Sequence, residues 1–409
     1  MYPKLRLLYT HLVEHQGQQI VMLRDPLQLT NQAVFVPWSL APLLKLCDGT
    51  RDENGLRAAL EVQAGLRLDP AHMQSILTQM DEALLFDNER FAAVCAEVLQ
   101  EYRAAPARSL SSAGQSYPDG PEELKAFLDG FSDLVRDKVV APHGAGPVHG
   151  LVSPHIDFQR GGPIYALAWS ALAEELPYAE LVIIFGTDHI GGEGKITLTY
   201  QHYATPWGVL PTARDVVEEI SQAIGLEEAF AEELHHRSEH SIELAAIWLH
   251  YTLLRKNAEA RCQLVPILCG AFDPAASAEE RARQEERFSA MLEALRRATA
   301  GRRTLAIAAG DLAHVGPAFG DFFPFDFSRR ASLRAADERL IEAICAGDAE
   351  AFRAEVEREG NRWNVCGLPP IYLTLRFLGK AEGYVLGYAQ CPADVVGASL
   401  VSICGIALR

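Results

Sequence analysis

The spacing of hydrophobic residues changes character about a quarter of the way along the chain. In residues 1–100, the short apolar segments Ile20–Leu23 and Ala33–Pro37 predict strands. Three stretches with helical spacing follow them, at residues 40–46, 52–64 and 69–85. The residues from Phe86 to Phe91 then fit a closing hairpin or wing. Together these elements predict a small winged-helix-like domain of the α+β class.

From residue 117 onward, apolar β-branched runs alternate with amphipathic segments. The runs predict buried strands at 148–153, 181–185, 262–268 and 304–309. The amphipathic segments predict helices at 121–131, 164–175, 213–224, 239–254, 278–299 and 331–346. This alternation predicts a three-layer α/β/α domain over residues 117–409 with a largely parallel sheet. Residues 101–116, rich in Ala, Ser and Arg, predict a linker between the two domains.

Composition narrows the class of protein. The 409 residues are 49% hydrophobic and 22% charged, which is typical of a globular chain. The net charge of −17 argues against binding to nucleic acid or to an anionic membrane surface. The longest apolar run, 395–408, is shorter than the roughly 20 residues that span a bilayer, and the first residues resemble no signal peptide. We therefore expect a cytoplasmic protein without a membrane or nucleic-acid partner.

Eight cysteines are present, and none forms a Cys-x-x-Cys pair. In a large cytosolic chain this predicts reduced thiols, with neither a disulfide framework nor a zinc knuckle. Cys366 is distinct because it precedes Gly367 at a predicted loop-to-helix junction, where a helix N-terminus favours the thiolate. A thiolate there is a candidate metal ligand or nucleophile, whereas most buried cysteines are small core residues.

Histidines follow three of the predicted strands. His155 comes after the first, Asp188 and His189 after the second, and Asp311 and His314 after the fourth. Ligands of α/β sheets bind beyond the carboxyl ends of the strands, and imidazoles held there are common ligands of Fe, Cu and Zn. Each histidine alone is an ordinary surface or cap residue, but their recurrence predicts a metal site.

A further polar segment lies at the predicted start of a helix, Glu239–Glu243, with Ser238 as the expected N-cap. Its two glutamates share one helical face, as do His236 and His240. The segment lacks the His-Glu-x-x-His spacing of zinc proteases. The alternative to a functional role is a structural one, in which these buried polar side chains only cap the helix.

A series of short motifs in this order resembles the Memo family (mediator of cell motility). They are Ser153–His155, Phe185–His189, Tyr203–Pro206, Glu239–Glu243, Val265–Gly270, Gly310–His314, Val365–Gly367 with Pro369–Ile371, and Gly387–Gln390. The resemblance covers about 295 residues. It implies a fold related to the class III extradiol dioxygenases. It also implies that the chain is similar to protein B of the AmmeMemoRadiSam system, whose partners are an AMMECR1-like protein and a radical-SAM protein.

The resemblance also implies a metal site and its residues. Its ligands for Fe(II) or Cu would be His155, His189 and Cys366. The implied catalytic or ligand-orienting side chains are Glu239, His240, Asp311 and His314. This chain departs from the family pattern at Ile156-Asp157-Phe158, at Ile190 and at Gln115, so its pocket wall differs.

The first 100 residues lie outside that resemblance. Asp48–Thr50 together with Leu84–Asp87 resembles modules related to PqqD, the pyrroloquinoline-quinone biosynthesis D protein, which bind peptides. Three functions remain open. They are a metal-dependent oxidoreductase acting on a small molecule or peptide, a non-catalytic metal- or peptide-binding partner of a radical-SAM system, and a thiol hydrolase that uses Cys366.

Overall fold

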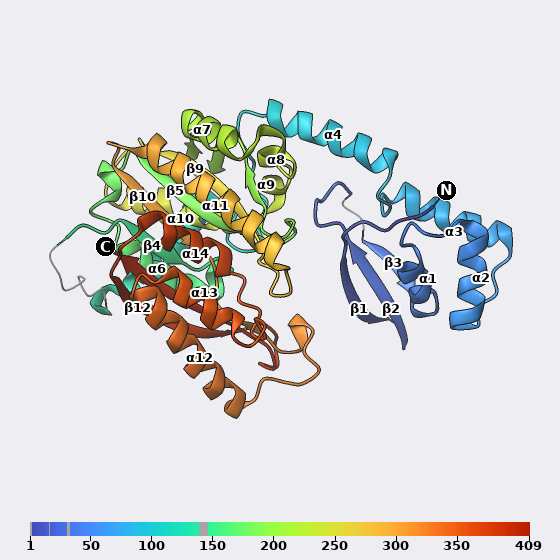
Figure 1. Cartoon of the computed structure of the whole chain (residues 1–409). Coiled ribbons are helices and arrows are strands. Elements are labelled where there is room, and N and C mark those ends of the chain that lie inside the picture. Colours follow the sequence, from blue (N-terminus) through green and yellow to red (C-terminus); the bar gives the residue numbers. More distant parts are fainter. Residues whose placement is uncertain (1, 16, 31–32, 139–145) are drawn as a thin grey trace. The chain divides into compact units, whose positions relative to one another are not determined.

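The computed structural model describes residues 2–15, 17–30, 33–138 and 146–409 (Figure 1). Its internal contacts divide the chain into two compact units, Met1–Ala105 and Pro106–Arg409. None of the helices in the described ranges combines the length and the apolar character needed to cross a bilayer.

In the first unit, α1, α2 and α3 share one hydrophobic core with a three-stranded antiparallel sheet of order β1-β2-β3. Its elements are β1 (Tyr9–His15), β2 (Gln18–Arg24), β3 (Val34–Pro37), α1 (Ala41–Leu46), α2 (Glu53–Ala64), α3 (Pro70–Glu82) and α4 (Glu89–Ala104). Asp52 and Asp69 cap α2 and α3 by accepting hydrogen bonds from backbone N–H groups. Leu23, Leu56 and Phe86 are among the residues of its core.

The hairpin or wing expected at Phe86–Phe91 is not formed. Phe86 instead makes an isolated antiparallel bridge with Leu5, and its side chain is buried in the core. Asn88 then caps α4 by accepting a hydrogen bond from the N–H of Phe91. The short polar segment is therefore a helix start, because an Asn side chain replaces the missing intrahelical acceptor. The resemblance of this unit to PqqD stays a prediction.

The second unit is an α/β domain built on one sheet. The four predicted strands form its parallel centre in the order β4-β10-β5-β9. They are β4 (Gly150–Ser153), β5 (Leu181–Asp188), β9 (Gln263–Gly270) and β10 (Thr304–Ala309). All eight residues of β5 are buried, as the continuous apolar run predicted.

Antiparallel strands flank this centre, so the sheet is mixed rather than largely parallel. They are β6 (Ile196–Leu198), which pairs with β9, and β11 (His314–Val315), β12 (Gly383–Pro392) and β13 (Leu400–Leu408) on the opposite side. β13 pairs with β4 and lies within the apolar run 395–408, for which the sequence predicts no strand. All nine residues of β13 are buried, but Ser402 and Gly405 interrupt its apolar run, so the run lacks the unbroken apolar character that predicted the central strands.

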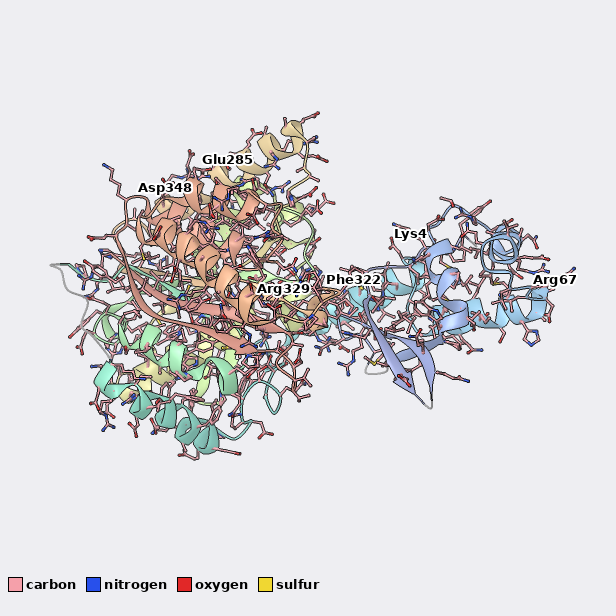
Figure 2. The ribbon with its side chains drawn as sticks, turned by 90° about the horizontal axis from the view of Figure 1, so that it is seen from below. Lys4, Arg67, Glu285, Phe322, Arg329 and Asp348 are labelled. Carbon is pink, nitrogen blue, oxygen red and sulfur yellow. The ribbon has the colours of Figure 1, made fainter. Side chains whose placement is uncertain are left out.

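Helices cover both faces of the sheet, which confirms the α/β fold class (Figure 1). One face is covered by α5 (Pro121–Leu134), α6 (Phe158–Ser170) and α10 (Ser241–Arg255). The other is covered by α7 (Arg214–Ile224), α11 (Ala278–Thr299), α12 (Phe327–Cys345), α13 (Ala349–Glu357) and α14 (Leu368–Leu378). Glu285 of α11 and Asp348, the N-cap of α13, are labelled in Figure 2.

The segment expected to be a linker is largely part of the second unit. Arg108 is buried there, where it forms an ion pair with Glu243 of α10 and donates to the backbone oxygens of His236, at 2.7 Å, and Glu239, at 2.8 Å. Glu243 also accepts from the backbone N–H groups of Ser111, at 2.9 Å, and Ser112, at 3.0 Å. The carboxylate oxygens of Glu243 and the guanidinium N–H groups of Arg108 thus have hydrogen-bond partners. This explains why the polar segment that contains Arg108 can be buried.

This buried pair predicts a large stability effect. Arg108→Ala leaves the Glu243 carboxylate buried without its cation, so we expect the free energy of unfolding to fall by about 3–5 kcal/mol. Urea unfolding followed by tryptophan fluorescence measures the change, because four of the five tryptophans lie in the second unit. The matched control is Arg261→Ala, whose pair with Glu259 is exposed and should contribute nothing measurable. Equal effects of the two variants would contradict this role for Arg108.

Candidate metal centre

The register of three parallel strands brings the predicted site residues to one edge of the sheet. Ala309 at the end of β10 lies opposite Ser153 on one side and Gly186 on the other. His155 therefore follows the end of β4, His189 follows the end of β5, and Asp311 follows the end of β10. The carboxyl ends of the strands carry these side chains, as expected for an α/β sheet.

Cys366 reaches this edge from the start of α14. The N–H of Gly367, the N-cap residue of α14, donates to the backbone oxygen of Asp311 at 2.9 Å. A Cβ atom at Gly367 would lie 2.4 Å from that same oxygen, and one at Gly310 would lie 2.7 Å from the Cα of Gly367. Glycine at both positions therefore permits the two backbones to approach, and this approach places the sulfur beside the strand ends.

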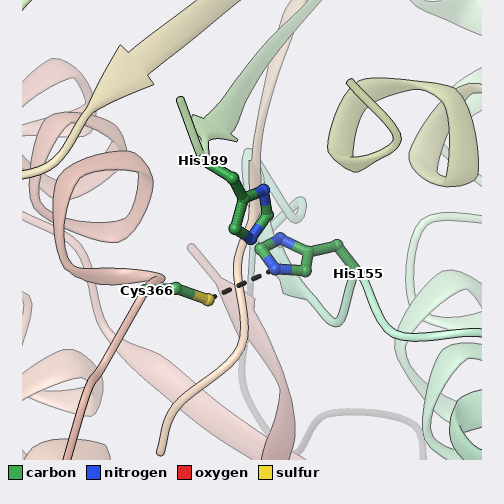
Figure 3. Close-up of side chains that lie close together, drawn as sticks. All are labelled: His155, His189 and Cys366. Carbon is green, nitrogen blue, oxygen red and sulfur yellow. Dashed lines mark hydrogen bonds between the residues drawn. The ribbon is translucent and has the colours of Figure 1, made fainter. Parts of the chain in front are cut away.

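His155, His189 and Cys366 converge as the three candidate ligands (Figure 3). The Sγ atom of Cys366 is 3.2 Å from Nε2 of His155. The two imidazole rings are 5.1 Å apart, and one ligand atom of each residue lies within 4.8 Å of the other two. Three separate segments of the chain thus supply two nitrogen donors and one sulfur donor to a single point.

Both candidate histidine ligands are oriented through their other ring nitrogen. Nδ1 of His155 donates to the backbone oxygen of Ala309 at 3.0 Å, and Nδ1 of His189 donates to Oε2 of Glu239 at 2.9 Å. These bonds leave the lone pair of each Nε2 free for a metal, which is how metal-binding histidines are usually held. The donor set fits a soft-to-borderline transition metal such as iron or copper.

Glu239 links His189 to His240. Its second oxygen accepts from the backbone N–H groups of His240, at 2.8 Å, and Ser241, at 3.0 Å, and lies 3.1 Å from Nδ1 of His240. The His189 and His240 rings stack at 5.0 Å. Helix α10 begins at Ser241 with His240 as its N-cap, so Ser238 is not the cap that we expected. The Glu239 carboxylate satisfies the free N–H groups there instead.

Asp311 and His314 lie beside Cys366, each with a donor atom within 4.8 Å of the others. Oδ1 of Asp311 accepts from the backbone N–H of His155 at 2.8 Å, and Oδ2 lies 3.6 Å from Nε2 of that histidine. Among the described residues, Oδ2 of Asp311 and Nδ1 of His314 have no hydrogen-bond partner although both are buried. Asp311 therefore positions the backbone of a candidate ligand, His155.

The charges of the centre stabilise one another. Burial alone would raise the pKa of the Cys366 thiol, but the neighbouring His155 and His314 hold that pKa well below its usual value. Burial opposes the charged form of His155, yet Asp311 and Cys366 raise its pKa to about 9. A metal ion bound here would itself supply positive charge beside the Cys366 thiolate.

Some site residues depart from the expectation. His236 makes its hydrogen bonds outside the candidate metal centre. Its ring contacts the Tyr203 hydroxyl at 2.7 Å and the Thr197 backbone oxygen at 3.0 Å. Asp157, where the family pattern differs, caps α6 by accepting from the N–H of Arg160 at 3.0 Å, so this departure serves the helix start.

A neighbouring polar cluster was missed from the sequence. Nδ1 of His235 lies 2.9 Å from Oδ2 of Asp188 and 3.9 Å from a carboxylate oxygen of Glu232. The two acids are separated by more than 40 residues, so no local motif links them.

The fold and the centre define an α/β protein with a candidate His-His-Cys metal site, and comparisons assign its family. The sequence profile described as "Memo-like protein" matches residues 108–406, so the chain belongs to the Memo-like family. A "MEMO1 family protein" from Aquifex aeolicus is 27% identical over 96% of this chain and 97% of its own length. Those from Thermus thermophilus (25%; 79% and 89%) and Methanopyrus kandleri (29%; 71% and 94%) are also similar.

The contact between Glu239 and His189 predicts the effect of one substitution on metal affinity. Glu239→Gln removes the negative charge that holds Nδ1 of His189, so we expect the metal affinity to fall by about 10–100-fold. Competition with a coloured chelator measures the affinity. The matched control is Glu228→Gln, because Glu228 pairs with Lys195 away from the candidate ligands. An unchanged affinity in Glu239→Gln would show that this carboxylate does not orient a ligand.

Proposed function

We propose that this Memo-family chain holds non-haem Fe(II) or Cu with His155, His189 and Cys366 and acts as a redox enzyme on a small molecule or peptide. The observation that carries the proposal is the meeting of these three donor atoms, with both histidines oriented through Nδ1. Core packing alone does not require two imidazoles and a thiol at one point, each supplied by a different segment.

The donor set bears on the choice of metal. A thiolate is softer than the carboxylate that completes the ligand set of non-haem iron oxygenases, so it favours Cu(I) or a thiolate-bound iron. It is also oxidisable, which requires handling without oxygen. Iron and copper should therefore both be measured in the purified protein.

Exposure indicates the side from which a substrate would approach. The side chains of His189 and His240 are 28% and 37% exposed, whereas those of His155 and Asp311 are 2% and 0% exposed. A bound metal would supply Lewis acidity and electron transfer at that opening. His314, which lies beside Cys366, is the side chain that would exchange a proton with a substrate bound at the centre. Glu239 would keep His189 and His240 in place during turnover.

A thiol hydrolase is the second candidate, and one contact favours it. The 3.2 Å separation of Cys366 Sγ and His155 Nε2 is also suitable for a cysteine nucleophile activated by histidine. Such an enzyme would work after all metal has been removed. A non-catalytic metal- or peptide-binding role would instead retain the metal and show no turnover.

We propose further that an AMMECR1-like protein and a radical-SAM protein are partners of this chain. The resemblance to protein B of that three-part system supports the assignment. The alignment with the Aquifex protein covers 96% of the chain, which is more than the second unit alone can provide, so that relative shares at least part of the first unit. Failure of the three purified proteins to co-elute in any pairwise mixture would refute the partnership.

Metal content tests the proposal directly. Protein purified without oxygen should carry iron or copper in near-stoichiometric amount, and Cys366→Ser should lose most of it because one of three ligands is gone. The matched control is Cys95→Ser, since Cys95 is a partly buried cysteine of the first unit and should leave the metal in place. Elemental analysis measures both. Negligible metal in the unaltered protein, even after loading with each ion, would overturn the site assignment.

Oxygen uptake with catechol as a probe then separates the roles. Uptake by the loaded protein that disappears in His314→Ala while the metal stays bound supports a redox enzyme. Bound metal without uptake favours the binding role, and esterase or peptidase activity after chelation favours the thiol hydrolase.

A further inference from the structure

A second set of metal-binding side chains lies beside the candidate metal centre and shares one residue with it. One donor atom each of Asp311, His314 and Cys366 lies within 4.8 Å of the other two. The first set consists of His155, His189 and Cys366, so the two sets have only the sulfur in common. The second set supplies an imidazole nitrogen, a carboxylate oxygen and a thiolate sulfur, which are donors that a borderline ion such as Zn²⁺ accepts.

Backbone hydrogen bonds hold the two segments of this second set against each other. The backbone oxygen of Asp311 accepts from the N–H of Gly367 at 2.9 Å. The backbone N–H of His314 donates to the oxygen of Trp363 at 2.8 Å. The His314 ring also packs edge-on against Phe319, with 5.1 Å between the ring centroids. Because both ends of the contact are fixed, the donor atoms converge before any ion binds.

Asp311 carries a buried oxygen that the protein leaves without a partner. Its side chain is 0% exposed, and its Oδ1 accepts from the backbone N–H of His155 at 2.8 Å. Its Oδ2 has no hydrogen-bond partner among the described residues. A buried carboxylate oxygen without a partner is costly, so a cation bound to Oδ2 would remove that cost.

The position of Oδ2 fits an ion separate from the first. Oδ2 of Asp311 lies 3.6 Å from Nε2 of His155, the atom that would bind the first ion. Ions in two-metal sites are about 3.5–4 Å apart, so two donor atoms at this spacing can each bind an ion of their own. The sulfur of Cys366 is 3.2 Å from the same Nε2, which places it to contact both ions.

We propose that Cys366 bridges two metal positions, and that Asp311 and His314 hold a second divalent cation such as Zn²⁺. The second ion would bind more weakly than the first, because the two cations repel each other and share one sulfur. A ring nitrogen bound to an ion cannot exchange a proton, so filling this position would stop the proton exchange assigned to His314. That regulatory consequence rests on the redox function proposed above.

A protein that holds two different metals tests the proposal. Protein loaded without oxygen with one equivalent of Cu(I) is titrated with zinc in competition with a coloured chelator, and X-ray absorption is recorded at both metal edges. We expect one equivalent of zinc to bind while the copper stays in place. Both edges should show a sulfur neighbour, and the two metals should be about 3.5–4 Å apart. Zinc should also lower oxygen uptake with catechol over the concentrations at which it binds.

One substitution separates the second position from the first. In Asp311→Asn the amide oxygen can still accept from the backbone N–H of His155, so the copper should be retained. Zinc binding should weaken about tenfold or more, because the carboxylate is gone. Copper binding without any zinc binding would overturn this proposal alone, whereas failure to bind copper would overturn the first site as well.

Two controls locate the zinc. His72→Gln changes an exposed histidine of the first unit and should leave both ions bound. Glu232→Gln tests the neighbouring cluster of Asp188, Glu232 and His235 and should also leave zinc binding unchanged. Loss of zinc in Glu232→Gln with unchanged binding in Asp311→Asn would overturn the proposal. A zinc edge without a sulfur neighbour would overturn it too, because Cys366 would then not be a bridge.

Discussion

The parallel register of β4, β10 and β5 is the constraint on which the candidate metal centre depends. Because Ala309 lies opposite both Ser153 and Gly186, the ends of three strands are level and the residues that follow them meet. A slip of one strand by one residue would turn each of its side chains to the other face and separate His155 from His189. The buried, β-branched centre of the sheet resists such a slip, so packing far from the site determines its geometry.

Two buried carboxylates hold the candidate histidine ligands at these strand ends. Each candidate histidine ligand has its backbone N–H held by a buried carboxylate from another element: Asp311 holds His155 at 2.8 Å, and Glu239 holds His189 at 3.1 Å. The two acids also balance the positive charge of the histidines, while the histidines stabilise the Cys366 thiolate. Ligand position and ligand charge are therefore controlled by the same two side chains.

The sequence predicted the parts of this structure that depend on local pattern. The four central strands, most of the helices that cover them and the histidines at three strand ends could be found from periodicity and position. The position of Cys366 before Gly367 at a predicted helix start made it a candidate ligand or nucleophile, and its assignment as a metal ligand came from the family resemblance. The packed segment from Pro106 onward was missed, since the partners that let Arg108 be buried, Glu243 among them, lie more than 120 residues later in the chain. Strand β13 was missed because Ser402 and Gly405 interrupt the apolar run that would otherwise predict a buried strand.

X-ray absorption at the metal edge tests the central claim most directly, because it counts the atoms bound to iron or copper in the loaded protein. The account predicts one sulfur and two imidazole nitrogens among the atoms bound to the metal, and no sulfur around the small amount of metal that Cys366→Ser still binds. A shell made only of nitrogen and oxygen in the unaltered protein would contradict it, since Cys366 would then not be a ligand.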